Sequence, residues 1–401
     1  MPSTKKSLAG ALAAFAISAP CAAQISDDVI KIGLVVDLTS LYADVTGQGV
    51  IEAMKMAIDD AGGSINGKRI EVIAGDYQNK PDIAASKARE WIDKESVDLL
   101  VAATNSSAAL AVARVAHEKK RPLLVVSTGT ARLTNEECNP YTIHYGYDSV
   151  ALARGTGAAV VKQGGKSWYF LTADYAFGSS LEKDTSDVVK ASGGTVLGSV
   201  RHPLSASDFA SFLLQAQSSK AQILGLANAG ADTVNAIKAA RDFNVTRTMK
   251  MAGLILFVND IHALGLDLAQ CMYLTDSWYW DQNEKSRAWS KRYFERMRKM
   301  PNAIQASSYS ATAHYLASVK ASGTDGSDKV MEHMKAAPIR DMLTSNGVIR
   351  PDGRMVSDLY LRQVKSPAES KYPWDYFKGG DRIPGDQAFT TKAESKCALW
   401  K

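Results

Sequence analysis

The sequence predicts an α/β fold made of two similar units in tandem, each a parallel sheet with helices on both faces. The chain has 401 residues, which is too long for one compact domain and comfortable for two. From Val29 onward, short β-rich runs alternate with amphipathic helical stretches, a pattern typical of parallel sheets covered by helices. The alternation begins again at Val150, so the second half is expected to repeat the architecture of the first.

The first unit opens with a buried strand and an amphipathic helix. Ile30–Asp37 is mostly apolar, and Gly49–Ala61 follows with apolar residues at the spacing of one helix face, namely Val50, Ala53, Met54 and Ala57. The same signals predict a strand at Arg69–Ala74, a helix at Ile83–Ile92, a strand at Asp98–Ala103, a helix at Ala108–His117 and a strand at Pro122–Val126.

The second unit repeats this order. It is expected to contain a helix at Val150–Val161, a strand at Ser167–Leu171, a helix at Ser180–Ala191, a strand at Thr195–Gly198, a helix at Phe209–Ala216, a strand at Gln222–Leu226, a helix at Thr233–Phe243 and closing segments at Lys250–Leu256 and Met272–Asp276. The link between the units, Tyr141–Ser149, lacks a Gly/Pro/Ser-rich linker and indicates a rigid extended crossing.

After Asp276 the pattern becomes helical. Three helices are expected, at Lys285–Arg298, Gln305–Ser322 and Ser327–Ala336. A last strand at Met355–Val364 must then join an existing sheet, before a tail rich in Pro, Gly and Lys.

The first residues have the pattern of a secretory signal peptide, expected over residues 1–23. Met1–Lys6 is short and basic, Leu8–Ala19 is apolar, and Pro20–Ala23 supplies small residues for cleavage before Gln24. A buried N-terminal helix is the weaker alternative. Cys21 raises a lipoprotein option, but Ser18-Ala19-Pro20 is a poor context for lipidation. The mature chain is therefore expected to be secreted and soluble.

Charge and cysteine content narrow the partners further. The formal net charge is +5 and no long Lys/Arg run is present, so nothing predicts nucleic-acid binding. In an oxidising compartment we expect one disulfide, between Cys138 and Cys397, because the long tail needs anchoring. Cys271 lies in the apolar run Leu268–Leu274 and is expected to be free and buried. A Cys271–Cys397 pair remains an alternative.

Candidate ligand-binding residues follow the predicted strands, because the carboxyl ends of parallel strands face a common crevice. The segments in question are Thr104–Ala108, Ser127–Thr130, Thr172–Gly178 and Ala227–Gly230. They are dominated by small, hydroxylic and aromatic residues and contain no Lys or Arg. Hydroxyls and free N–H groups at helix N-termini can bind a carboxylate without a cation.

Each candidate also has a structural interpretation. Ser106 and Ser107 could be helix N-caps, and Tyr175 and Phe177 could be packing aromatics. Packing is also the favoured interpretation of Trp278-Tyr279-Trp280, of which Tyr279 is the best candidate for a cleft.

Catalytic motifs are mostly missing from the sequence. There is no Gly-x-Ser-x-Gly and no His-Glu-x-x-His. A partial phosphate-loop match at Gly62 and Gly67-Lys68 continues with Arg69 instead of Ser or Thr, and runs from a helix into a strand. The histidines are scattered and no cysteines have metal-ligand spacing. The sequence therefore favours a binding protein over an enzyme, without a cofactor or metal.

The order and spacing of several short motifs resemble the periplasmic substrate-binding proteins of ABC transporters, of the leucine/isoleucine/valine-binding type. The matching text is Lys31-Ile32-Gly33-Leu34, Thr39-Ser40-Leu41-Tyr42-Ala43, Ala57-Ile58-Asp59-Asp60 with Gly67-Lys68, Ser106-Ser107-Ala108 and Gly178-Ser179. The ending, from Asp352-Gly353-Arg354-Met355 to Pro373-Trp374-Asp375-Tyr376, resembles a subgroup with an extended C-terminus. Members of the broader set take up amino acids, amides and aromatic acids.

The resemblance implies the type I periplasmic binding protein fold, in which two Rossmann-like lobes joined by three crossovers hold a ligand in the cleft. The crossovers would fall near Tyr147, Asp276 and Val348. The N-terminal lobe would comprise residues 27–147 and 277–348, and the C-terminal lobe residues 148–276 and 349–401. A monomeric periplasmic protein that delivers a small molecule to a membrane permease is implied. A sensing protein that signals to a receptor and, less favoured, a secreted α/β hydrolase are the alternatives.

Relatives of this type hold the ligand carboxylate with the segments at Ser106-Ser107 and Ser127–Ala131, and the ammonium group with an aromatic at the Phe177 position and an acid. This sequence departs from them, because Asn228–Gly230 lacks their aromatic and Gly253–Phe257 is apolar where they have a glutamate. A carboxylate with an aromatic or hydrophobic body is therefore expected, with branched-chain or aromatic amino acids next if Asp174 reaches the cleft. The expected ligand-binding residues are Tyr42, Asn105, Ser106, Ser107, Ser127, Thr128, Gly129, Asp174, Tyr175, Phe177, Asn228 and Tyr279, with Leu256 and Phe257 as apolar lining.

Overall fold

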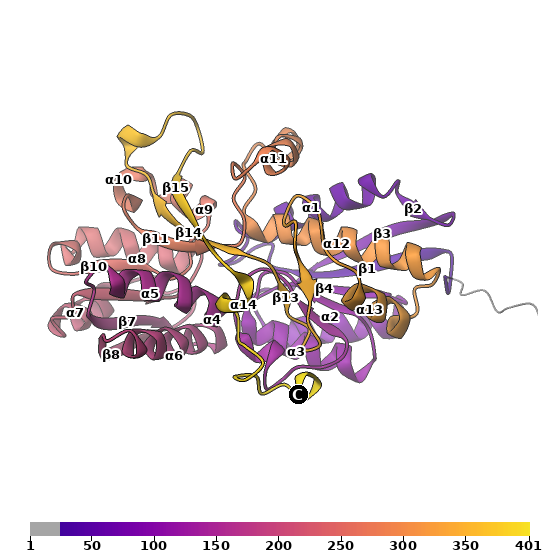
Figure 1. Cartoon of the computed structure of the whole chain (residues 1–401), viewed down its shortest axis with the longest axis horizontal. Helices are drawn as coiled ribbons and strands as arrows, with labels where there is room; N and C mark the ends of the chain where they lie inside the picture. Colours follow the sequence, from indigo (N-terminus) through magenta and orange to yellow (C-terminus); the bar gives the residue numbers. More distant parts are fainter. Residues whose placement is uncertain (1–24) are drawn as a thin grey trace, which may run out of the picture.

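The computed structural model describes residues 25–401, and the signal peptide expected over residues 1–23 lies outside them. Figure 1 shows two α/β lobes side by side along the longest axis, with chain segments passing between them. This is the architecture expected from the repeated strand–helix pattern. No helix within the described residues is long and apolar enough to cross a membrane.

The N-terminal lobe contains a six-stranded sheet in the order β2-β3-β1-β4-β5-β6. All neighbours pair in parallel except β2, which forms a short antiparallel pair with β3. Its elements are β1 (Val29–Val36), α1 (Gly47–Asp60), β2 (Ser64–Ile65), β3 (Lys68–Asp76), α2 (Pro81–Lys94), β4 (Leu99–Ala103), α3 (Ser106–Glu118), β5 (Leu123–Val125), the short 3-10 helix η1 (Ala131–Thr134) and β6 (Thr142–His144).

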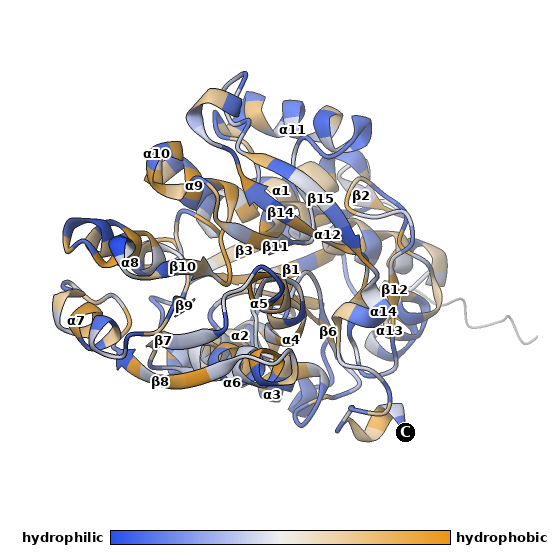
Figure 2. Ribbon diagram, turned by 60° about the vertical axis from the view of Figure 1, so that its left-hand side comes forward, coloured by the Kyte–Doolittle hydropathy of each residue, from blue (hydrophilic) through white to orange (hydrophobic). Residues whose placement is uncertain are grey.

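Helices cover both faces of this sheet, which explains why β1 is apolar on both sides. Val35 belongs to the core beneath α2 and α3, whereas Leu34 and Val36 belong to the core that α1 completes on the opposite face. Figure 2 colours both lobes by hydropathy, and much of α11 (Glu284–Met297) is blue at the edge of the molecule.

The C-terminal lobe contains a four-stranded parallel sheet in the order β10-β9-β7-β8. Its elements are α4 (Ser149–Leu152), a π-helical turn η2 (Ala153–Gly157), α5 (Ala158–Lys162), β7 (Ser167–Ala173), α6 (Ala176–Ala191), β8 (Thr195–His202), α7 (Ala210–Ser218), β9 (Ile223–Ala227), α8 (Ala231–Asp242), η3 (Val245–Arg247), β10 (Lys250–Gly253), α9 (Val258–Leu264), α10 (Leu266–Ala269) and β11 (Tyr273–Asp276).

The helix expected at Val150–Val161 is interrupted by the π-helical turn. The turn packs tightly on β11, because a Cβ on Gly155 would lie 2.1 Å from Thr275 Oγ1. Thr156 and Thr275 also share a hydrogen bond of 2.9 Å. The first helix of the C-terminal lobe is thereby fixed to the strand where the chain leaves that lobe.

Later segments return to the N-terminal lobe and then cross again. The helices α11, α12 (Ala303–Ser322) and α13 (Ser327–Ala336) follow β11, and α11 and α12 both pack on α1. The remaining elements are β12 (Val348–Ile349), β13 (Met355–Val356), β14 (Leu359–Val364), η4 (Pro367–Glu369), β15 (Phe377–Ile383), α14 (Gly385–Ala388) and η5 (Ala398–Trp400).

The strand expected at Met355–Val364 is in fact two strands that pair at different places. β13 pairs with β12, and Arg354 forms a bridge with His144, the last residue of β6. In contrast, β14 joins β11 and β15 in a separate three-stranded sheet. The third passage between the lobes therefore lies between β13 and β14, later than the position near Val348 expected from the resemblance.

The division at residue 349 placed the whole C-terminal tail in the C-terminal lobe, but the tail returns to the N-terminal lobe. Cys397 forms a disulfide with Cys138 of the N-terminal lobe, the pairing expected from the sequence. On the way, the Phe389 carbonyl accepts a 2.8 Å hydrogen bond from Arg154 of the C-terminal lobe. Cys271 is free as expected, but it is exposed rather than buried, because it lies in a left-handed turn (φ 67°) at the surface.

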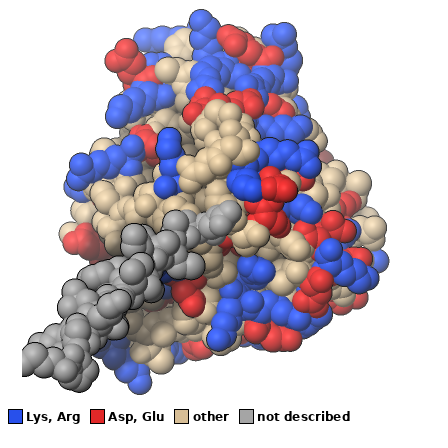
Figure 3. Space-filling view, turned by 90° about the vertical axis from the view of Figure 1, so that its right-hand side faces the viewer, with Lys and Arg blue, Asp and Glu red and all other residues tan. Residues whose placement is uncertain are grey.

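The end of the N-terminal lobe seen in Figure 3 carries Lys and Arg intermingled with Asp and Glu. Ion pairs of this lobe, such as Lys31–Glu95 at 3.7 Å, join charges of opposite sign. On the atoms visible in this view, charges of one sign do not gather into an extended patch, which agrees with the charge pattern of the sequence.

Candidate ligand-binding cleft

A cavity lies between the lobes, at the carboxyl ends of the strands. Its lining combines residues of both lobes and of the first crossover. The lining residues are Tyr42, Val45, Thr46, Thr104, Asn105, Ser106, Ser127, Gly129, Tyr147, Tyr175, Phe177, Ala229, Gly230, Phe257 and Ile304.

The cleft is closed in this structure, because the lobes touch around the cavity. Tyr42, in the loop after β1, and Tyr175, just before α6, share a hydrogen bond of 2.6 Å between their hydroxyls. Gly230 has a φ of 61°, and a Cβ there would lie 3.0 Å from the Leu41 carbonyl. A Cβ on Gly129 would lie 2.3 Å from the Phe177 ring, so both glycines permit the close approach of the lobes.

The polar wall of the cavity comes from the N-terminal lobe. At the end of β4, Asn105 caps α3 by accepting a 2.8 Å hydrogen bond from the Ala108 N–H. The Ser106 hydroxyl is buried and has no hydrogen-bond partner within the described part of the chain. The first N–H groups of a helix also lack intrahelical acceptors, so this corner offers donors to an anion.

Other hydroxyls of the lining already have acceptors. The Ser127 hydroxyl donates to the Thr104 carbonyl at 3.2 Å, and the Thr104 hydroxyl donates to the Asn105 carbonyl at 3.2 Å. Thr46 donates to the Tyr42 carbonyl at 2.9 Å. These bonds fix the loops and leave few donors for a ligand.

Aromatic rings form much of the remaining wall. Tyr175, Phe177 and Phe257 come from the C-terminal lobe, and Tyr147 comes from the first crossover and packs on Phe257 with ring centroids 5.8 Å apart. Among residues 25–401, no Lys, Arg, His, Asp or Glu lines the cavity. Burial raises the pKa of Tyr147 above its usual range, so its hydroxyl is protonated.

Two buried acids lie behind the lining. Asp260 accepts a 2.8 Å hydrogen bond from the Phe257 N–H and caps α9, and burial raises its pKa to about 7. Asp232 accepts a 3.1 Å hydrogen bond from the Ser205 N–H through Oδ2, and its buried Oδ1 has no partner among the described residues. Burial raises the pKa of Asp232 to about 6. Its charge also raises the pKa values of Tyr42 and Tyr175, although burial is the larger cause for both.

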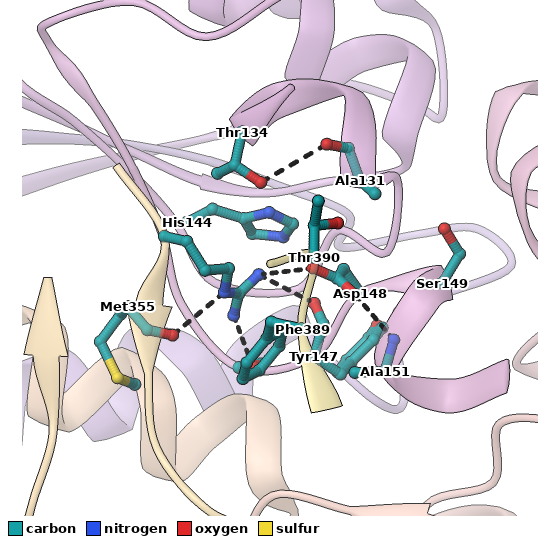
Figure 4. A network of polar contacts seen from close by, with 12 residues as sticks. Ala131, Thr134, His144, Tyr147, Asp148, Ser149, Ala151, Met355, Phe389 and Thr390 are labelled. Atoms are coloured by element: carbon teal, nitrogen blue, oxygen red, sulfur yellow. Dashed lines mark hydrogen bonds and ion pairs between the residues drawn. The ribbon is translucent and has the colours of Figure 1, made fainter. Parts of the chain in front are cut away.

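A buried arginine holds the crossover that carries Tyr147. Tyr147, Asp148, Met355 and Phe389 gather at this point of the fold (Figure 4). Arg354 is fully buried among them and donates to the Gly146 carbonyl at 2.5 Å and to the Met355 carbonyl at 3.0 Å. It also forms an ion pair with Asp148 at 3.6 Å.

The same crossover fixes the loop after β5. The Tyr147 hydroxyl donates to the Ser127 carbonyl at 2.7 Å. The His144 ring donates to the Thr128 carbonyl at 2.6 Å, and burial lowers the pKa of His144, which keeps the ring neutral. The polar wall therefore depends on contacts made by the crossover.

The structure brings most of the predicted site residues together in the cavity. Those that line it are Tyr42, Asn105, Ser106, Ser127, Gly129, Tyr175 and Phe177, together with the apolar Phe257. Ser107 does not line the cavity, because it follows Ser106 around the helix. Thr128 does not line it either, since its hydroxyl donates to the Thr104 carbonyl at 3.0 Å.

Three predicted residues lie elsewhere for clear physical reasons. Asp174 is exposed, with its carboxylate 3.5 Å from Arg201, so it cannot serve as the ammonium partner in this closed cleft. Asn228 is buried behind the wall, where it donates to the neutral His202 ring at 3.1 Å and accepts from Thr233 at 2.7 Å. Tyr279 packs under the second crossover and donates to the Trp374 carbonyl at 2.8 Å.

Sequence reasoning missed some of the lining. Tyr147 was expected only as a crossover residue, and Ile304 arrives from the start of α12, far along the chain. Leu256 is buried near its neighbour Phe257 but does not line the cavity. Within residues 25–401, no group of His, Cys, Asp and Glu is arranged to hold a metal ion.

The comparisons with known proteins agree on one family. The sequence pattern of the family described as "Periplasmic binding protein" matches residues 29–371. A crystal structure of a periplasmic binding protein from Burkholderia mallei is 61% identical, with a TM-score of 0.92, and the match covers 93% of this chain and 100% of that one. Among curated proteins none matches the sequence.

Two further structures are similar to this chain at lower identity. A branched-chain amino acid ABC transporter periplasmic ligand-binding protein from Burkholderia xenovorans is 35% identical, with a TM-score of 0.82 and coverage of 93% and 100% of the two chains. A solute-binding protein of an ABC transporter from Rhodopseudomonas palustris, solved with 3,4-dihydroxybenzoic acid, is 23% identical, with a TM-score of 0.81 over 90% of this chain and 98% of that one. The latter likeness concerns the fold alone.

Proposed function

This chain belongs to the family of periplasmic binding proteins of ABC transporters, and from that premise we propose that it binds a small carboxylate with an aromatic or hydrophobic body for uptake. The ligand enters the cleft between the lobes, the lobes close on it, and the closed protein delivers it to a membrane permease. Binding proteins of this family serve transport and not catalysis. We expect the protein to act as a monomer.

The observation that carries the proposal is the chemistry of the cavity lining. It offers the free Ser106 hydroxyl and the N-terminus of α3 to an anion, and rings to the rest of the ligand. Burying a phenyl-sized group against such rings contributes roughly 1.5–3 kcal/mol. A buried ammonium group without an acid beside it would lose more in desolvation than neutral hydrogen bonds return. A protein of the same fold was solved with 3,4-dihydroxybenzoic acid, which agrees with an acid of this kind.

A second candidate is a branched-chain or aromatic amino acid. One observation favours it: the buried Oδ1 of Asp232 has no partner among the described residues, and the charge of Asp232 acts on Tyr42 and Tyr175 in the cavity wall. A relative at 35% identity is described as a branched-chain amino acid binding protein. An ammonium group in the cavity would need this carboxylate.

The experiment is a thermal-shift and calorimetry screen that compares benzoate and substituted benzoates with leucine, valine, phenylalanine, glutamate and urea. The proposal expects stabilisation by aromatic acids in the wild type and in an Asp232→Asn variant alike. Amino acids that bind the wild type but not Asp232→Asn would establish the second candidate. Stabilisation by glutamate or urea alone would contradict both. Native mass spectrometry of freshly purified protein provides an independent check for a co-purified ligand.

Uptake and sensing use the same binding event and differ in the partner of the closed protein. We propose uptake, because the family match covers binding proteins of ABC transporters. A pull-down with membrane extract in the presence of the bound acid should retain a permease. Retention of a receptor in place of the permease would favour the sensing alternative.

A further inference from the structure

The hydrogen-bond donors in the cavity wall indicate a second polar group on the ligand besides its carboxylate. Each phenol carries one O–H donor, so the Tyr42–Tyr175 pair has two protons. Only one of them lies in the 2.6 Å bond between the hydroxyls, and either oxygen can supply it. The other proton has no acceptor within residues 25–401, because the bond between the two phenols is the only hydrogen bond that either hydroxyl makes there.

The remaining hydroxyls of the lining differ from this pair. Those of Thr46, Thr104, Ser127 and Tyr147 all donate to backbone carbonyls. The Ser106 hydroxyl, in contrast, has no partner in the described chain. The cavity therefore contains two spare side-chain donors, one on α3 of the N-terminal lobe and one on the phenol pair that joins the lobes.

The environment of the phenol pair makes its spare proton a donor rather than a source of negative charge. Tyr42 is buried and Tyr175 is partly buried. Burial raises the pKa of both, and the nearby charge of Asp232 raises them further, so both hydroxyls stay protonated at any physiological pH. Before a ligand closes the cleft, water can accept the hydrogen bond of the spare O–H. A ligand that displaces that water must replace its hydrogen bond or bind more weakly.

We propose that the ligand carries a second oxygen, on the ring that bears or follows its carboxylate, and that the Tyr42–Tyr175 pair donates to this oxygen. This deepens the proposed function and rests on it. The class is an oxygen-substituted aromatic acid, such as a hydroxy acid, in preference to the unsubstituted acid or its alkyl analogue. The specificity resides in a hydrogen bond that exists only when the cleft is closed, because each lobe supplies one phenol.

The test compares ligands of matched size in matched variants by calorimetry. The probes are benzoate, 3- and 4-hydroxybenzoate, and 3- and 4-methylbenzoate, in which the methyl group fills the space of the hydroxyl without accepting a hydrogen bond. In the wild type, at least one hydroxy isomer should bind about three- to tenfold more tightly than its methyl counterpart, the range of one neutral hydrogen bond. The Tyr42→Phe/Tyr175→Phe double variant should bind the two alike.

Two controls separate this effect from general damage to the cleft. Tyr147→Phe also removes a phenol hydroxyl from the lining, but that hydroxyl donates to the Ser127 carbonyl and is not spare. This variant should keep the wild-type preference for the hydroxy acid, even if its affinity for all acids changes. The single Tyr42→Phe and Tyr175→Phe variants each keep one phenol proton, and at least one of them should retain the preference.

The outcomes also separate this inference from the proposed function. Equal binding of hydroxy and methyl isomers by the wild type would overturn the inference while leaving a carboxylate-binding protein. So would a double variant that still prefers the hydroxy acid, or one that weakens benzoate as much as hydroxybenzoate, because the phenols would then contact the carboxylate itself. Failure of every benzoate to bind would overturn the proposed function as well.

Discussion

The replacement Ser106→Ala tests the proposed anion-binding corner of the cleft by removing a single atom, the hydroxyl oxygen. The Ser106 hydroxyl is buried in the cavity wall and has no partner within the described residues. Its removal therefore breaks no hydrogen bond of the ligand-free protein. It does remove a donor to a bound carboxylate.

The magnitude follows from this asymmetry. A hydrogen bond to a charged group contributes roughly 1.5–3 kcal/mol, which corresponds to a loss of affinity of roughly 10- to 150-fold. The free energy of unfolding should stay the same or rise slightly, because an unsatisfied buried hydroxyl is itself unfavourable. Loss of affinity without loss of stability is the expected signature.

Calorimetry with the acid identified in the screen measures the affinity, and urea denaturation measures the stability. Ser107→Ala is the matched control, since Ser107 is the next residue of the same helix and does not line the cavity. It should bind within about twofold of wild type, a difference below the energy of one hydrogen bond. If Ser106→Ala binds like wild type, or if Ser107→Ala loses as much affinity, the assignment of this corner is wrong.

Four further predictions concern the fold and the charge of the cleft. Arg354→Met leaves Asp148 buried without its partner and should lower the free energy of unfolding by about 3–5 kcal/mol in urea titrations, part of which Asp148→Asn should restore. Serine at both Cys138 and Cys397 should lower it by about 2–4 kcal/mol, and a reductant should then have no additional effect. Burial raises the pKa of Asp232 to about 6, so this carboxyl is protonated below pH 6 and charged above it. The affinity for an anion should therefore fall as pH rises through 6, and the affinity for an ammonium-bearing ligand should rise. The Asp232→Asn variant should show neither trend. Small-angle scattering should give a smaller radius with the bound acid than without it, and identical profiles would contradict hinge closure.

The lobes and the proposed anion-binding corner follow from local sequence signals. Apolar runs such as Ile30–Asp37 and Asp98–Ala103 identify the buried strands, and the residue after a parallel strand must lie at the cleft edge. Asn105 and Ser106 were predicted for this reason. Their neighbour Ser107 was included because a sequence does not show which side of the first helical turn faces the cavity.

Residues that depend on tertiary arrangement could not be placed in the same way. Ile304 lines the cavity because α12 begins beside it, and no local pattern specifies where that helix begins in space. Asp174 follows a strand as Tyr175 does, yet its side chain turns to solvent and Arg201. Cys271 lies in an apolar run, but its positive φ turns it to the surface.

The distribution of contacts over the two lobes explains why the body of the ligand should control closure. The free donors for a carboxylate, at Ser106 and the start of α3, belong to the N-terminal lobe and remain available when the cleft is open. Tyr175, Phe177 and Phe257 belong to the C-terminal lobe and can contact the ligand only after closure. A ligand shifts a conformational equilibrium only by its difference in affinity for the two states. The phenyl-sized body of the proposed ligand would supply that difference, roughly 1.5–3 kcal/mol, which would shift the ratio of closed to open protein roughly 10- to 150-fold. An acid without such a body, for example acetate, would occupy the same donors and leave the lobes apart. Acetate should therefore not reduce the scattering radius at the concentrations at which an aromatic acid does.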